Sequence, residues 1–185
     1  MDKIQPVDRF PLTLIRLHWL TLVLIAATYA LMEFKDIFPR GSDGRELMKA
    51  THYSLGLTIL GLTLARIVMR FTSGPAPAIE PPLAPMQAQA AKFLHIALYA
   101  FLVAMPVIGW LLLSAEGKTI VFYGLSLPPL IGPDKIWDGR LEEVHETLAT
   151  VGYVLIGLHA VAALVHHHVL KDTTLRRMLP HKSAA

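Results

Sequence analysis

Four long apolar segments constrain this chain more than any other feature of its sequence. They run roughly over residues 12–32, 48–70, 93–115 and 141–170. An α-helix needs about 20 predominantly apolar residues to cross the hydrocarbon core of a bilayer. Backbone polar groups find no water there, so a spanning segment must satisfy them internally, as a helix does. The pattern predicts an all-α integral membrane protein, a four-helix bundle that forms a single domain over residues 1–185.

The composition agrees with a lipid bilayer as the main partner of the chain. Hydrophobic residues make up 54% of the sequence and charged residues only 17%, whereas a soluble domain carries about 25% charged residues. The net charge is +3, but the basic residues form no cluster, so we expect no nucleic-acid partner. Cysteine is absent, which excludes disulfides, thiolate-bound iron–sulfur clusters and covalently attached c-type haem. Any metal cofactor must use other ligands, and nine histidines are available.

The distribution of basic residues predicts the orientation in the membrane. Four spans place both termini on one side, and ten basic residues belong to that side: Lys3, Arg9, Arg16, Arg66, Arg70, Lys92, Lys171, Arg176, Arg177 and Lys182. Seven belong to the other side: Lys35, Arg40, Arg45, Lys49, Lys118, Lys135 and Arg140. Because cytoplasmic loops carry the excess of Lys and Arg, both termini are predicted to be cytoplasmic.

Two histidines of the last span share one face of a helix at two different depths. His145 and His159 are separated by 14 positions, which corresponds to about 21 Å along a helix and only about 40° around it. One helix therefore offers a ligand near each membrane surface. Gly152, halfway between them, lacks a side chain where two flat cofactors would approach each other.

The predicted membrane topology places a second histidine at each of these two depths. With the N-terminus inside, His18 starts on the cytoplasmic side and can meet His159, whereas His52 enters from the outer side and can meet His145. Gly56 follows His52 by one turn and would leave room for a porphyrin on the same face. Ionisable residues inside spans are costly and are functional by default.

Two b-type haems, each held by two histidines, explain four histidines at paired depths. A single intramembrane histidine would indicate only a hydrogen bond to a neighbouring helix. Zinc would gather its ligands at one depth and often recruits thiolate, which these spans do not offer. Neutral imidazole suits haem iron. His95 also lies at cytoplasmic depth, so it could replace His18 as a ligand, or pack beside the inner haem.

Several motifs together resemble the prokaryotic cytochrome b561 family over nearly the whole chain. They include Arg16–Leu20, Phe38–Arg40, His52–Gly56, Pro106–Gly109, His145–Ala149, Ile156–Ala160, Lys171–Leu175 and Arg177–Pro180. The resemblance implies a bacterial inner-membrane cytochrome whose periplasmic haem is bound by His52 and His145. It implies that His18 and His159 bind the cytoplasmic haem, which is the pairing that the depths indicate.

Within this family the chain resembles the superoxide:ubiquinone oxidoreductases, so superoxide and ubiquinone are the implied substrates. No residue is predicted to be catalytic beyond the haem ligands. The quinone-site candidates are His166, Arg66 and Arg70. The candidates for steering the superoxide anion are Arg40, Arg45, Lys49 and Lys118. The stretch Glu116–Lys118 departs from the family pattern, which leaves the outer substrate site open.

Two other functions remain compatible with the sequence. The same di-haem core could serve as the cytochrome b subunit of a hydrogenase or formate dehydrogenase, with a redox partner protein as electron donor. Alternatively, the chain could be a transporter or a structural helix bundle without haem. Copurification with a dehydrogenase subunit would indicate the cytochrome b subunit, and a colourless purified protein would indicate the bundle without haem. His166 could also be only an interfacial cap of the last helix.

Overall fold

A computed structural model describes residues 8–180 and contains four long helices. They are α1 (Leu12–Glu33), α2 (Asp43–Thr72), α3 (Pro85–Ala115) and α4 (Lys135–Val165). All four are long and apolar enough to cross a membrane, so the predicted multi-pass, mostly helical architecture is confirmed. Lys3 and Lys182, which entered the orientation argument, lie outside the described residues.

Three of the helices begin earlier than the apolar segments do, because polar capping residues start two of them and a proline starts the third. Ser42 caps α2 by accepting a hydrogen bond from the Arg45 N–H, and Asp134 caps α4 by accepting from two backbone N–H groups. Pro85 occupies the first turn of α3, where its missing N–H costs nothing. Hydropathy detects only the lipid-facing part of a helix, so these polar first turns escaped it.

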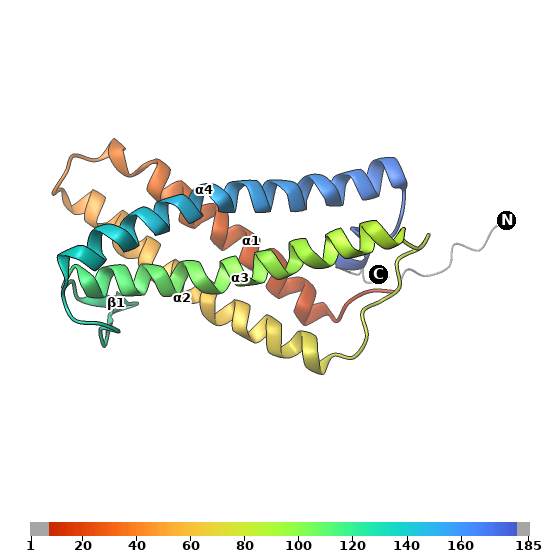
Figure 1. Cartoon of the computed structure of the whole chain (residues 1–185), viewed down its shortest axis with the longest axis horizontal. Coiled ribbons are helices and arrows are strands. Elements are labelled where there is room, and N and C mark those ends of the chain that lie inside the picture. Colours follow the sequence, from red (N-terminus) through yellow and green to blue (C-terminus); the bar gives the residue numbers. More distant parts are fainter. Residues whose placement is uncertain (1–7, 181–185) are drawn as a thin grey trace, which may run out of the picture.

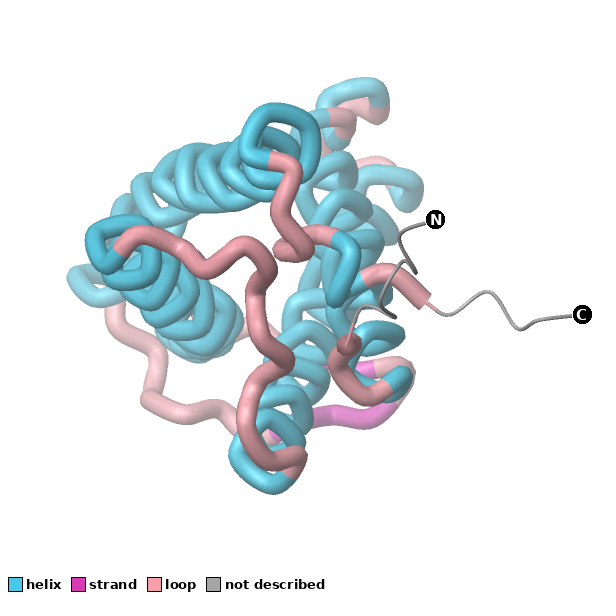
Figure 2. The backbone as a smooth tube through the Cα atoms, turned by 90° about the vertical axis from the view of Figure 1, so that its right-hand side faces the viewer, coloured by secondary structure: helices cyan, strands magenta, loops and turns pink. Residues whose placement is uncertain are grey.

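The helices form two hairpins that lie lengthwise side by side (Figure 1). Helix α1 packs against α2, α3 packs against α4, and α2 packs against α3. The start of α1 and the C-terminal segment lie at one end of the bundle, where the Phe10 N–H donates to the Arg177 carbonyl (3.3 Å). Figure 2 looks along the bundle from this end and shows loops crossing it. We call it the inner end, and the opposite one the outer end.

The buried core is small and lies at mid-height. Ile59, Phe101 and Leu102 form it, with partly buried side chains from α1, α3 and α4 around them. Many large apolar side chains point outward instead; Val23, for example, is 63% exposed and Phe93 is 75% exposed. A soluble protein rarely exposes so much contiguous apolar surface, so we assign these outward faces to lipid.

The connections differ at the two ends. At the outer end, the short helix η1 (Lys35–Ile37) follows α1, and a hairpin of β1 (Ile120–Phe122) and β2 (Leu125–Leu127) follows α3. Its turn places Tyr123 and Gly124 at positive φ, the backbone twist that favours two-residue hairpins. At the inner end, the connector over residues 73–84 contains no helix or strand.

Candidate functional site

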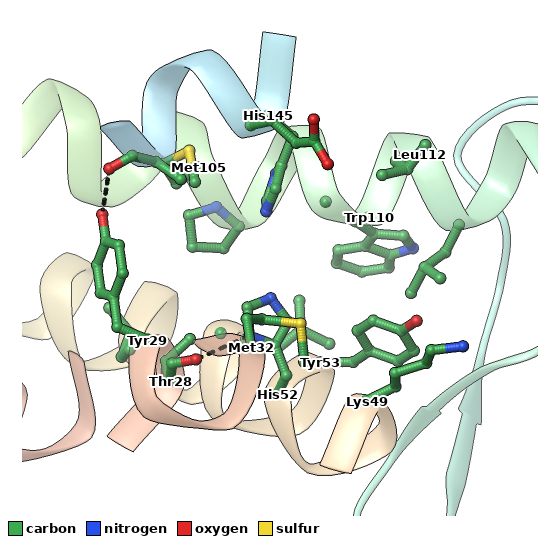
Figure 3. Close-up of a pocket in the computed structure, with 18 of the residues that line it drawn as sticks. Thr28, Tyr29, Met32, Lys49, His52, Tyr53, Met105, Trp110, Leu112 and His145 are labelled. Carbon is green, nitrogen blue, oxygen red and sulfur yellow. Dashed lines mark hydrogen bonds between the residues drawn. The ribbon is translucent and has the colours of Figure 1, made fainter. Parts of the chain in front are cut away.

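The structure brings His52 of α2 and His145 of α4 together near the outer end. Their ring centres lie 6.3 Å apart, with an angle of 73° between the ring planes. Two imidazoles on one metal ion, with bonds of about 2 Å and about 1 Å from nitrogen to ring centre, would be about 6 Å apart. Figure 3 shows the two rings pointing toward each other across the cavity. The spacing of this outer pair fits one metal ion between them.

The hydrogen bonds of the outer pair also favour metal binding. His52 Nδ1 lies 3.2 Å from the Thr28 carbonyl oxygen. A carbonyl only accepts, so Nδ1 donates and Nε2 keeps a free lone pair, the arrangement common among metal-bound histidines. His145 Nδ1 is buried and has no hydrogen-bond partner among residues 8–180. Gly109 makes room for this ring, since a Cβ there would lie 3.2 Å from His145 Cε1.

A cavity of about 540 Å³ surrounds the outer pair. Its walls come from all four helices and include Met32, Tyr53, Met105 and Trp110 (Figure 3). This volume lies within the roughly 300–1,000 Å³ of ordinary ligand pockets. A Cβ on Gly56, beside His52, would meet nothing within 4 Å, so the predicted free space is present. The outer site therefore fits a large, flat, mainly apolar cofactor held by two imidazoles.

A second group of histidines lies near the inner end. The rings of His18 (α1) and His159 (α4) have centres 6.1 Å apart, again a suitable spacing for one shared metal ion. His95 (α3) is also close, at 5.2 Å from His159. Its Nδ1 lies 2.6 Å from the Ala91 carbonyl oxygen of its own helix. The structure thus places both inner candidates beside His159.

Arg66 affects whether His18 can bind a metal ion at the inner site. Its Nη2 lies 3.1 Å from His18 Nδ1, and because a guanidinium only donates, Nδ1 accepts. The proton of a neutral His18 then resides on Nε2, and that tautomer cannot bind metal through Nε2. The inner spacing fits a haem, but ligation through Nε2 requires Arg66 to turn away from His18. Arg66 Nε is buried and has no hydrogen-bond partner within the described part of the chain, so it could donate to an acidic group of a ligand.

The space between the two histidine groups is filled by aromatic side chains. A Cβ on Gly152 would collide with Tyr29 Oη and Phe101 Cζ. Tyr29 Oη also donates to the Ala149 carbonyl (2.8 Å). The sequence suggested that Gly152 leaves room for two approaching cofactors. This interpretation needs correction, because Gly152 instead admits two rings that form a packed layer between the sites.

The three quinone-site candidates have separate surroundings. Arg66 lies in the inner histidine group, and Arg70 Nη1 donates to the Gly74 carbonyl (2.8 Å) at the end of α2. His166 lies at the end of α4, where its Nδ1 is 2.5 Å from Asp172 Oδ2. His166 is thus the candidate whose side chain is held by a buried carboxylate.

The steering candidates also differ from one another. Lys49 and Lys118 line the outer cavity, and each pairs with a carboxylate at 2.9 Å. Partial burial opposes the charged form of Lys118, but the neighbouring Glu116 outweighs it and raises the Lys118 pKa. Arg45 is buried and paired with Asp36, which gives it a structural role in the loop after α1. Arg40 is exposed on the same loop.

Some residues of the site escaped sequence reasoning. The Thr28 contact with His52 runs through a backbone carbonyl, which carries no sequence signal. Gly109 and Asp172 stand within the motifs that carry the family resemblance, but nothing in those motifs indicated what either residue contacts.

The fold and the two histidine groups define a multi-pass membrane protein whose interior offers paired imidazoles at two depths. A family profile described as prokaryotic cytochrome b561 matches residues 9–181. The chain belongs to this family, which confirms the resemblance seen in the sequence. It is therefore a membrane electron-transfer protein of the haem-binding cytochrome b561 type.

Individual relatives agree with this assignment. The chain is 40% identical over 176 residues to cytochrome b561 homolog 1 of Escherichia coli (strain K12), covering 95% of this chain and 99% of that protein. It is 37% identical over 168 residues to the probable superoxide oxidase CybB of Yersinia pestis, covering 91% and 94%. Cytochrome b561 homolog 2 of E. coli is 29% identical over 178 residues, covering 96% and 94%.

Proposed function

We propose that this protein is a superoxide:ubiquinone oxidoreductase of the bacterial inner membrane that carries two b-type haems. His52 and His145 bind the outer haem, and His18 and His159 bind the inner one. The observation that carries this proposal is the pair of histidine groups at two depths of α4, with ring centres 6.3 Å and 6.1 Å apart. The 37% identity to a probable superoxide oxidase supports the choice of electron donor.

Each bound haem supplies a one-electron redox centre, so that two superoxide ions yield two dioxygen molecules and the electrons that reduce one quinone to quinol. The protein's own residues hold and insulate the two centres. The Thr28 carbonyl orients His52, and Arg66 is available to an acidic group at the inner site. The packed layer of Tyr29 and Phe101 against Gly152 lies midway along α4 between the two sites.

The orientation follows the charge argument, with the inner end and both termini in the cytoplasm. Superoxide then reaches the outer end from the periplasm, and quinone takes its protons at the cytoplasmic surface. Superoxide is an anion, so positive potential at the mouth of the outer cavity raises its rate of arrival. Lys49 and Lys118 are the steering candidates that line this cavity.

The steering role predicts a rate effect that depends on salt. The double variant Lys49→Gln/Lys118→Gln should lower the second-order rate of haem reduction by superoxide by roughly three- to tenfold at low ionic strength. The difference should shrink as salt screens the charges. Rapid-mixing absorbance at several salt concentrations measures it. The matched control is Lys135→Gln/Arg140→Gln, which removes two charges from the same face but not from the cavity lining. Equal effects of the two variants would exclude local steering.

Rapid mixing also tests the proposed function itself. Oxidised, haem-loaded protein is mixed with superoxide and excess ubiquinone. We expect the b-haem absorbance bands to reduce and quinol to accumulate at one molecule per two superoxide ions. If superoxide leaves the bands oxidised, the superoxide assignment is wrong. Reduction by a copurifying hydrogenase or dehydrogenase subunit would then indicate an electron-transfer subunit instead.

A further inference from the structure

A buried carboxylate faces the last helix at the inner end of the bundle. Asp172 is only 3% exposed, and its Oδ2 lies 2.5 Å from His166 Nδ1. The other oxygen, Oδ1, accepts from the Thr174 N–H at 2.9 Å. Burial by itself opposes ionisation, but the hydrogen bonds from His166 and Thr174 hold the pKa of Asp172 below its usual value. The carboxylate is therefore ionised, and both of its oxygens accept hydrogen bonds.

The local backbone is built so that these two residues meet. Helix α4 continues as the π-helix η2 (His166–Leu170), and Lys171 then turns the chain back with a left-handed φ of 56°. The Asp172 N–H donates to the His166 carbonyl at 3.1 Å. π-helical turns are rare and occur frequently at functional sites.

The segment over residues 172–180 is fixed at many points to the rest of the inner end. Thr173 and Glu80 of the connector exchange two hydrogen bonds of 3.0 Å. Trp19 Nε1 donates to the Met178 carbonyl at 2.7 Å. Arg177, in the short helix η3 (Arg176–Met178), donates to the Pro77 carbonyl. Asp172 is thus held in place by α1 and the connector, and not only by its own helix.

The other ring nitrogen of His166 is open to a ligand. Nε2 has no hydrogen-bond partner among residues 8–180 and is not one of their buried unpaired atoms. His166 follows His159 by seven positions, about 10 Å along the helix and within roughly 20° of the same face. A group bound at Nε2 would therefore lie just beyond the inner histidine group.

We propose that Asp172 positions His166 to present Nε2 to a carbonyl oxygen of the quinone and to deliver one of its protons. This inference rests on the proposed function. The quinone gains two electrons through the protein and two protons; one proton leaves His166 Nε2 for the carbonyl oxygen, and the other comes from cytoplasmic water. Asp172 stays ionised throughout and stabilises the protonated imidazole, which regains its proton from the same water. His167, His168 and Lys171 are the charged or titratable neighbours of this pair along the chain, and Glu80 and Arg177 hydrogen-bond to Thr173, the residue after Asp172.

The first test substitutes Asp172→Asn and compares it with Asp134→Asn, which removes a carboxylate from the far end of α4. Protein reduced beforehand with dithionite is mixed with ubiquinone, and haem oxidation is followed against pH. We expect Asp172→Asn to keep its haem and its reduction by superoxide, while quinone reduction slows by roughly tenfold or more. Because the imidazolium would lose its counter-charge, the dependence of the rate on pH should also change. Asp134→Asn should match the wild type in both respects.

A second variant separates positioning from a structural role. In His166→Gln the side-chain amide can still donate to Asp172, but it cannot deliver a proton, so we expect the same slow quinone reduction and loss of the pH dependence at an unchanged melting temperature. Wild-type rates and pH profile in either folded variant would overturn the inference. If superoxide does not reduce the wild-type haems, only the proposed electron donor is wrong. The role of Asp172 and His166 is still tested, because the protein reduced with dithionite measures the quinone step separately.

Discussion

Replacing His145 by alanine should lower the haem content of the purified protein from two per chain to one. The change removes one of two imidazoles that face each other with ring centres 6.3 Å apart, and a haem with one remaining protein ligand in an open cavity is lost during purification. Haem per chain, measured as the pyridine haemochrome, and the remaining b-type spectrum both report the result. His52→Ala should reproduce it, because the two side chains serve one site.

The control for this prediction is His168→Ala, which removes an exposed histidine of η2, the continuation of α4, and should retain both haems. An unchanged haem content in His145→Ala would contradict the ligand assignment at the outer site. At the inner site a second comparison identifies the partner ligand of His159, because His18 and His95 both lie beside it. We expect His18→Ala to lose the inner haem and His95→Ala to keep it; the reverse result would make His95 the ligand.

Replacing Gly152 by alanine should destabilise the protein by about 1–3 kcal/mol, the usual cost of overpacking a filled core. The added Cβ would collide with Tyr29 Oη and Phe101 Cζ and would lie 2.9 Å from Phe101 Cε2. Both rings are held, Tyr29 by its bond to the Ala149 carbonyl and Phe101 by the buried core. Thermal unfolding in detergent measures the loss.

Gly157 provides a matched control on the same helix. A Cβ there meets nothing within 4 Å, so Gly157→Ala should leave stability unchanged or raise it by up to about 1 kcal/mol through helix propensity. Adding Phe101→Leu to Gly152→Ala should recover part of the loss, because a smaller side chain frees the space. Equal melting temperatures of the two alanine variants would show that the layer between the sites is not tightly packed.

The architecture and the outline of the site were accessible from the sequence. Partition into a bilayer depends on consecutive apolar residues, which hydropathy reads directly, and all four spans were found. The regular rise and rotation of a helix set the relative depths of His145 and His159. Topology alone then paired His52 with the outer depth and His18 with the inner one, and the structure places each pair together.

Only the tertiary structure decided what surrounds these side chains. The Thr28 carbonyl on His52, Arg66 on His18 and the two rings at Gly152 are contacts between different helices. The burial of Arg45 and the pairing of Asp172 with His166 likewise depend on how chain segments fold back. Hydropathy and helical periodicity are properties of one segment at a time. Which atoms meet across segments depends on side-chain volume and on the packing of whole helices, so it emerged only when the chain was folded.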